Sequence, residues 1–150
     1  MSFDIILQHA HRVMQDLGIG HREAIYAKAL NVSLNKYSIP HRSEVDIPIM
    51  FDGECVGHGR ADLIVGNVLV EIKALNNPPK DALAQLKKYV ANLSLVEKKR
   101  YQGVVLNFCQ KTGNVSIFMQ HEDKPPPIKR KAVLPPTPVV KSRFFIKKRK

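Results

Sequence analysis

Two apolar runs that meet at Gly66-Asn67 are the feature that most constrains how this chain folds. The dipeptide is typical of the two-residue turn of a β-hairpin, and the runs on either side have the composition of strands. Counting outward from the turn places Asp62 opposite Glu71 and Arg60 beside Lys73. One face of the predicted hairpin then carries only apolar side chains: Ala61, Leu63, Val65, Val68, Val70 and Ile72.

The expected pairing of Asp62 with Glu71 needs a physical reason. Like charges that face each other on neighbouring strands destabilise a sheet. A divalent cation removes the repulsion, because hard cations such as Mg²⁺ bind carboxylate oxygens. The alternative is a surface cluster of ion pairs, in which Arg60 and Lys73 neutralise the two acids. The spacing alone leaves both interpretations open.

These residues also carry a resemblance to a known family. Asp62, followed after eight residues by Glu71-Ile72-Lys73, resembles the Asp…(Asp/Glu)-x-Lys signature of the PD-(D/E)XK nuclease superfamily. Upstream, Gly20–Tyr26 is similar to the motif that names the GxxExxY family, a branch of that superfamily. Downstream, Ala84–Tyr89 resembles the second-helix segment of the same family. The similarity runs in order from about Val13 to Met119.

The resemblance implies metal-assisted hydrolysis of phosphodiester bonds. It assigns one or two Mg²⁺ or Mn²⁺ ions to Asp62, Glu71 and the main-chain carbonyl of Ile72. Lys73 would orient or deprotonate the attacking water, and a role as base would require a depressed pKa. Ala61 stands where the superfamily often has proline.

Two polar residues on predicted helices have a structural and a catalytic interpretation. Glu23 is an acid in the first turn of a helix, where the helix dipole favours it. The resemblance instead implies that Glu23 faces the metal site or holds Lys73 or Arg60 in place. Gln85 is either a solvent-facing helix residue or a group that hydrogen-bonds a substrate phosphate or the attacking water. Tyr26, one turn from Glu23, is expected to pack rather than to take part in the chemistry.

Hydrophobic spacing predicts the remaining elements. Apolar residues three or four apart predict helices, and alternating residues between turn signals predict strands. The helices are expected over 3–17, 21–36 and 80–95, and further strands over 43–51, 54–65, 101–109 and 115–119. This order predicts an α/β fold with a mixed central sheet flanked by helices, which matches the restriction-endonuclease-like αβββαβ core of the superfamily.

The first hairpin fixes what should cover the carboxylates. Counting outward from the turn at Asp52-Gly53 places Val45, Ile47 and Ile49 on the same sheet face as Asp62 and Glu71. We expect the helix that bears Glu23 to cover this face. A bulge at Gly57 or Gly59 would change this register.

A change in composition marks the domain boundary. Residues 122–150 hold ten of the 24 Lys and Arg, two of the 13 acids and six of the ten prolines. We therefore expect a nuclease-like domain over 1–121 and a Pro-rich basic tail over 122–150 that is disordered when unbound. With Arg60, its basic clusters are candidate contacts to nucleic acid: Lys129, Arg130, Lys131, Lys147, Lys148, Arg149 and Lys150. A nuclear-localisation signal or a protein partner would also fit the tail.

Composition excludes several classes of protein. The chain has no apolar run of the ~20 residues that a membrane-spanning helix needs, and its first residues do not read as a signal peptide. Cys55 and Cys109 have neither metal-ligand nor redox-pair spacing, which indicates free thiols in a reducing, intracellular compartment, the cytoplasm or the nucleus.

Two functional hypotheses follow. The first is a metal-dependent nuclease, with DNA favoured over RNA as substrate. The second is a non-catalytic nucleic-acid-binding or structural protein, for example virion- or chromatin-associated, that keeps the fold and binds through its tail. A homodimer is compatible with either hypothesis.

Overall fold

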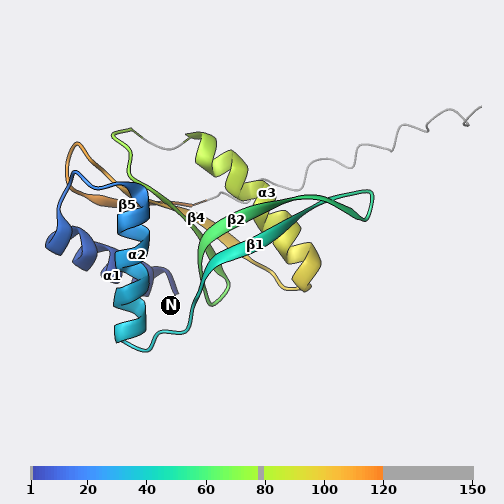
Figure 1. Cartoon of the computed structure of the whole chain (residues 1–150), viewed down its shortest axis with the longest axis horizontal. Helices are drawn as coiled ribbons and strands as arrows, with labels where there is room; N and C mark the ends of the chain where they lie inside the picture. Colours follow the sequence, from blue (N-terminus) through green and yellow to red (C-terminus); the bar gives the residue numbers. More distant parts are fainter. Residues whose placement is uncertain (1, 78–79, 120–150) are drawn as a thin grey trace, which may run out of the picture.

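The computed structural model describes residues 2–77 and 80–119, and the predicted tail lies outside them. Within these residues, three helices and five strands follow one another in the predicted order (Figure 1). They are α1 (Ser2–Leu17), α2 (Glu23–Lys36), β1 (Arg42–Phe51), β2 (Glu54–Val65), β3 (Val68–Lys73), α3 (Lys80–Glu97), β4 (Gln102–Phe108) and β5 (Val115–Met119). The type of every predicted element is confirmed, and the ends differ by two residues at most.

The five strands form one mixed sheet in the order β1-β2-β3-β4-β5. Strands β3 and β4 are parallel, whereas the other neighbouring strands are antiparallel. Parallel neighbours need a crossover connection, and α3 provides it between β3 and β4. The α/β fold with a mixed sheet, of the restriction-endonuclease type, is thereby confirmed.

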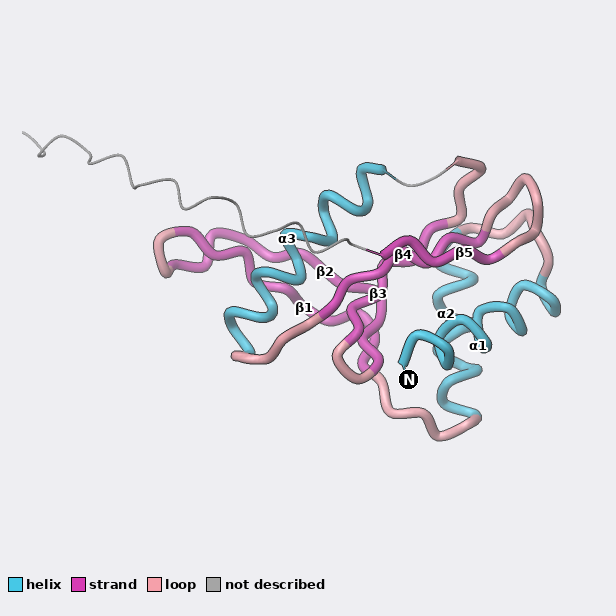
Figure 2. The backbone as a smooth tube through the Cα atoms, turned by 180° about the vertical axis from the view of Figure 1, so that it is seen from behind, coloured by secondary structure: helices cyan, strands magenta, loops and turns pink. Residues whose placement is uncertain are grey.

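Helices cover the two faces of the sheet unequally (Figure 2). α1 and α2 pack on one face, where their aliphatic residues meet alternate side chains of β2, β3 and β4. α3 packs on the other face against a smaller cluster that includes Ile47, Leu69 and Val105. Strand β3 is buried on both faces, as its apolar composition predicts for the centre of a layered domain.

The helix predicted to cover Val45 and Ile47 was the wrong one. Both residues pack in the α3 cluster, together with Ala61, and not under the helix that bears Glu23. The pairing explains part of the error: Val56 is an extra residue on β2, and this bulge pairs Val45 with Ala61. Ala61 and Leu63 were also expected to share a face, and this is wrong. Ala61 packs in the α3 cluster, whereas Leu63 packs under α1 and α2, so the alternation of side chains breaks at Asp62 between them.

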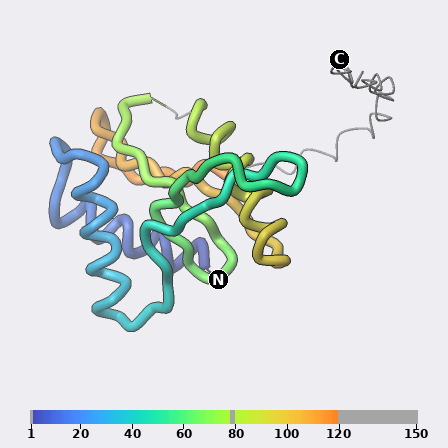
Figure 3. Tube along the Cα trace, turned by 45° about the vertical axis from the view of Figure 1, so that its right-hand side comes forward, coloured from blue at the N-terminus to red at the C-terminus, as the bar shows by residue number. Residues whose placement is uncertain are grey.

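Strands β1 and β2 form a long hairpin that extends away from the other strands (Figure 3). Both residues of its turn, Asp52 and Gly53, have positive φ, as the sequence predicted for a tight hairpin turn. At Gly59 the hairpin passes so close to α3 that a Cβ atom would lie 2.5 Å from the ring of Tyr89. The hairpin is therefore fixed against α3 at this glycine.

The buried stripe of α2 consists of Tyr26, Leu30 and Leu34. Ile25 is exposed, whereas Tyr26 is fully buried and stacks on Phe108 with 4.6 Å between ring centroids. The expectation that Tyr26 packs is confirmed. In the part of the chain that the structure describes, none of the helices has the length and apolar character to cross a membrane.

Candidate active site

The candidate site lies where β2 separates from β3. The ladder between these strands contains three pairs and ends at Leu63 with Val70. The expected pairs of Asp62 with Glu71 and of Arg60 with Lys73 are therefore not rungs of the sheet. In place of the next rung, the Asp62 carboxylate accepts a hydrogen bond of 2.7 Å from the Ile72 amide.

Burial and nearby charge perturb both carboxylates. Burial is the main cause of a raised pKa at Asp62, and the hydrogen bond from Ile72 opposes the shift. Glu71 is only 8% exposed. Burial, followed by the charge of Asp62, raises its pKa to about 7. A buried glutamate whose pKa is raised by the neighbouring Asp62 does not fit the exposed ion-pair cluster that the spacing also allowed.

Lys73 connects the acids of the site. Its ammonium lies 3.2 Å from Oε1 of Glu71 and 3.7 Å from Oε1 of Glu23. Burial lowers the pKa of Lys73, but the surrounding carboxylates, Glu71 first, outweigh this and raise it. The depressed pKa that a general base requires is therefore absent, and Lys73 is a cation in this arrangement.

A network of hydrogen bonds fixes the loop that presents Glu23. The Tyr26 hydroxyl donates to the Gly18 carbonyl at 2.7 Å, and the Gln110 side chain accepts from the Gly20 amide at 2.7 Å. Gln110 also donates to the Tyr26 hydroxyl at 3.1 Å. Gly20 has φ 100°, a conformation that suits glycine. The Gly, Glu and Tyr of 20–26 thus have a structural explanation: a turn, a side chain in the site and a buried anchor.

The site opens into a groove beside α3, with a volume of about 1020 Å³. We call it the α3 groove, and its lining includes Glu23, Lys73 and the predicted Gln85. Gln85 donates a hydrogen bond of 2.9 Å to the Tyr89 hydroxyl. The groove thereby brings together three of the predicted catalytic residues from α2, β3 and α3.

Sequence reasoning missed a basic stripe in the α3 groove. Lys80 and Lys88 also line it, and both are exposed. Lys88 stands eight positions after Lys80 in α3, and Ala84 lies midway between them, so all three share a face of the helix. This spacing was visible in the sequence once the helix was predicted.

A side-chain brace holds the chain just beyond Lys73. Asn107 is 3% exposed and accepts a hydrogen bond of 2.9 Å from the Leu75 amide. It also donates one of 3.2 Å to the Leu75 carbonyl. Because Asn107 lies beside Lys73 in the parallel ladder, this brace fixes the end of the strand that carries the site. A polar residue in the apolar strand β4 was the available signal.

The other predicted contact residues are Arg60, whose charge acts to lower the pKa of Asp62, and the basic clusters of the tail. Arg60 is exposed and forms an ion pair of 3.5 Å with Glu44. It faces Asp46 in β1 rather than Lys73. The basic clusters 129–131 and 147–150 fall in the part of the chain that the structure does not describe.

The donors available to the expected divalent metal are the carboxylates of Asp62 and Glu71 and the main-chain carbonyl of Ile72. Glu71 Oε2 is buried and has no hydrogen-bond partner within the described residues. An unpartnered buried carboxylate oxygen next to a second carboxylate suits a hard cation. In an extended strand the N–H and C=O of one residue point to the same side, so the Ile72 carbonyl faces the side of Asp62. Over 2–77 and 80–119, no group of three or more His, Cys, Asp or Glu side chains is placed to hold a metal ion.

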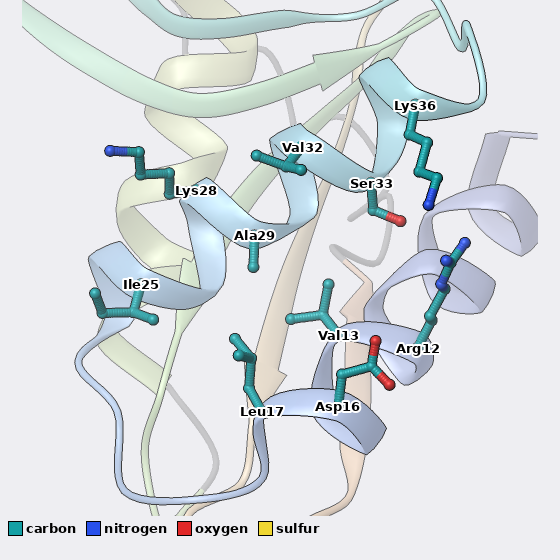
Figure 4. A pocket seen from close by; sticks show the side chains of 10 residues that line it. All are labelled: Arg12, Val13, Asp16, Leu17, Ile25, Lys28, Ala29, Val32, Ser33 and Lys36. Atoms are coloured by element: carbon teal, nitrogen blue, oxygen red, sulfur yellow. The ribbon is translucent and has the colours of Figure 1, made fainter.

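A second hollow lies between α1 and α2 (Figure 4). Its volume is about 450 Å³, and aliphatic side chains such as Val13, Ile25 and Val32 form its wall. Arg12, Lys28 and Lys36 lie among its lining residues. It shares no lining residue with the α3 groove, so the carboxylates and the apolar hollow are separate features.

Comparison with known proteins agrees with this geometry. The family model of the PD-(D/E)XK nuclease superfamily matches residues 2–117. The chain belongs to this superfamily. A search of curated proteins and a search of solved structures gave no significant match. Membership of the PD-(D/E)XK superfamily suggests a nuclease that acts on nucleic acid, and superfamily members generally use divalent metals.

Proposed function

We propose that this PD-(D/E)XK protein is a divalent-metal-dependent nuclease that hydrolyses phosphodiester bonds of DNA. The observation that carries the proposal is the half-buried Asp62 next to the buried Glu71, with Lys73 beside them and one Glu71 oxygen that has no hydrogen-bond partner among the described residues. Burial without compensation is costly, and a bound cation would offset it. The Gly20, Glu23 and Tyr26 motif, with its structural roles, supports placement in the GxxExxY branch.

In this proposal the residues of the site have separate roles in metal binding and charge stabilisation. Asp62, Glu71 and the Ile72 carbonyl would hold Mg²⁺ or Mn²⁺. The bound ion would polarise the scissile phosphate and lower the pKa of a coordinated water. Lys73 presents an ammonium beside the acids, where it stabilises negative charge that develops on the phosphate. Glu23, with Oε1 3.7 Å from the Lys73 ammonium, helps to hold it in place.

The α3 groove would receive the substrate. Lys80 and Lys88 would neutralise backbone phosphates without reading base sequence. Gln85 would donate a hydrogen bond to a phosphate oxygen, after release from Tyr89. In this proposal the tail over 122–150 adds further phosphate contacts and is not needed for the cut itself.

Cleavage assays on the full chain test the proposal. Labelled single-stranded, double-stranded and branched DNA, and RNA, are incubated with Mg²⁺ or Mn²⁺. We expect wild type to cut, and Asp62→Asn, Glu71→Gln and Lys73→Met each to lower the rate by about a hundredfold or more. Lys36→Met is the matched control, because Lys36 lines the separate hollow between α1 and α2.

The same proteins distinguish the alternative function. If none cuts any substrate while all bind nucleic acid equally, the chain is a binding protein that keeps the nuclease fold. That is the function that the basic tail suggests, and binding should then fall away when 122–150 is removed. Under the nuclease proposal, removal of 122–150 weakens binding and reduces its salt dependence but leaves cleavage intact.

A further inference from the structure

A cluster of cysteine, histidine and aspartate lies on the β1–β2 hairpin and takes no part in the proposed nuclease chemistry. The sulfur of Cys55 lies 3.6 Å from Nε2 of His58, and its thiol is also within hydrogen-bond distance of the Gly57 carbonyl, at 3.3 Å. Nδ1 of the same ring lies 2.8 Å from one carboxylate oxygen of Asp46 and 3.1 Å from the other. Cys55 is exposed, and the other two side chains are 60% and 67% exposed, so small reagents can reach the sulfur.

The bulge in β2 creates this cluster. Residues three apart in a regular strand point to opposite faces. Because Val56 is an extra residue on β2, His58 pairs with Pro48 and shares a face with Cys55, which pairs with Met50. Without the bulge, His58 would pair with Ile47 and point towards α3. The bulge thus places the imidazole of His58 on the same face of the hairpin as the thiol of Cys55.

The Asp46 carboxylate determines which nitrogen of the His58 ring carries the proton. Since Asp46 accepts a hydrogen bond from Nδ1–H, the neutral ring carries its lone pair on Nε2, the nitrogen that faces Cys55. When Nε2 takes the thiol proton, Asp46 stabilises the resulting imidazolium. A thiolate beside an imidazolium that a third group orients is the arrangement of an activated nucleophile.

We propose that Cys55 is a modification site that reacts with low-molecular-weight disulfides. His58 takes the thiol proton, and the thiolate attacks one sulfur of the disulfide. The S–S bond of the reagent breaks as the bond to Cys55 forms, and the departing thiolate takes the proton from His58. The products are a mixed disulfide on the hairpin and one free thiol.

The second cysteine needs separate treatment. Cys109 lies in the turn after β4, where a hydrogen bond from the Thr112 hydroxyl, followed by backbone amides, lowers its pKa. Its thiol is therefore also reactive towards disulfides. The kinetic test uses the full chain with Cys109→Ser, so that Cys55 is the one thiol measured.

The probe is 2,2′-dithiodipyridine, a neutral disulfide whose reaction is followed by absorbance. A neutral reagent removes the effect of local charge on encounter. We expect His58→Gln to lower the second-order rate constant near pH 7 by about fivefold, because the side chain that takes the thiol proton is lost. His11→Gln, which removes an exposed histidine of α1, should leave the rate unchanged.

Asp46 acts through His58 and is a positioning residue. Asp46→Asn should slow the reaction by about twofold to threefold, and Asp46→Glu should restore most of the rate, since it returns a carboxylate to the ring. Circular dichroism of each variant reports whether it is folded. Equal rates in wild type, His58→Gln and Asp46→Asn would overturn the proposal, and so would an equal loss in His11→Gln.

Peptide mapping completes the test on the wild-type chain. After brief exposure to glutathione disulfide, mass spectrometry should find the mixed disulfide on Cys55. An adduct confined to Cys109 would overturn the proposal. Neither experiment depends on nuclease activity, so the proposal for Cys55 is tested independently of the proposed function.

Discussion

The raised pKa of Glu71 predicts an unusual pH dependence of stability for the metal-free protein. Its pKa rises from 4.5 in a solvated chain to about 7 in the folded state. Between these values the folded protein binds more protons than the unfolded chain, so the free energy of unfolding falls as the pH rises. Each pKa unit corresponds to about 1.4 kcal/mol, which gives a loss on the order of 3 kcal/mol once the pH exceeds about 7.

The perturbation that isolates this effect is Glu71→Gln, which is similar in size and cannot ionise. Urea unfolding in the presence of a chelator, from about pH 5 to about pH 8, gives the free energy of unfolding for both proteins. We expect wild type to be close to the variant at the acid end and less stable by on the order of 3 kcal/mol at the alkaline end. Asp62 and Glu23 also have raised pKa values, so a smaller slope should persist in the variant. Parallel pH profiles in the two proteins would refute the argument.

Two further substitutions test the supports of the site. Gly59→Ala should destabilise the protein by about 1–3 kcal/mol, because its Cβ meets the Tyr89 ring, whereas Gly57→Ala, which meets open space, should have little effect in the same urea measurement. Tyr26→Phe should cost about 1 kcal/mol through the lost hydrogen bond to Gly18, and an unchanged unfolding midpoint would show that this bond contributes nothing.

Much of the fold followed from local pattern in the sequence. The turn at Asp52-Gly53 and the three rungs beside Gly66-Asn67 were predictable because each depends on a few neighbouring residues. The helix that covers Val45 was not, because its assignment depends on a one-residue bulge at Val56. A single extra residue inverts the side-chain direction along the rest of a strand. Gly57, next to Val56, marks a place where a bulge can form, but the glycine alone does not show that one does.

The candidate site was predictable as a set of residues but not as an arrangement. Family motifs pointed to five residues: Glu23, Asp62, Glu71, Lys73 and Gln85. In the structure Glu23, Lys73 and Gln85 line the α3 groove, and Asp62 and Glu71 lie next to Lys73. Their protonation depends on burial and on neighbours distant in sequence, which spacing does not reveal. The raised pKa of Lys73 is the clearest example.

The hydrogen bond from the Ile72 amide to Asp62 has a consequence for how such chains change over evolutionary time. Asp62 closes the seam where β2 leaves β3, so its carboxylate supports folding as well as any chemistry. A descendant that lost catalysis would still be under selection to keep an oxygen acceptor at this position. Replacement by alanine would leave the Ile72 amide without its acceptor, whereas asparagine keeps the bond and removes the charge. An acid at position 62 can therefore be kept for structural reasons alone. The buried Glu71 oxygen, which has no hydrogen-bond partner among the described residues, is the stronger indication of function.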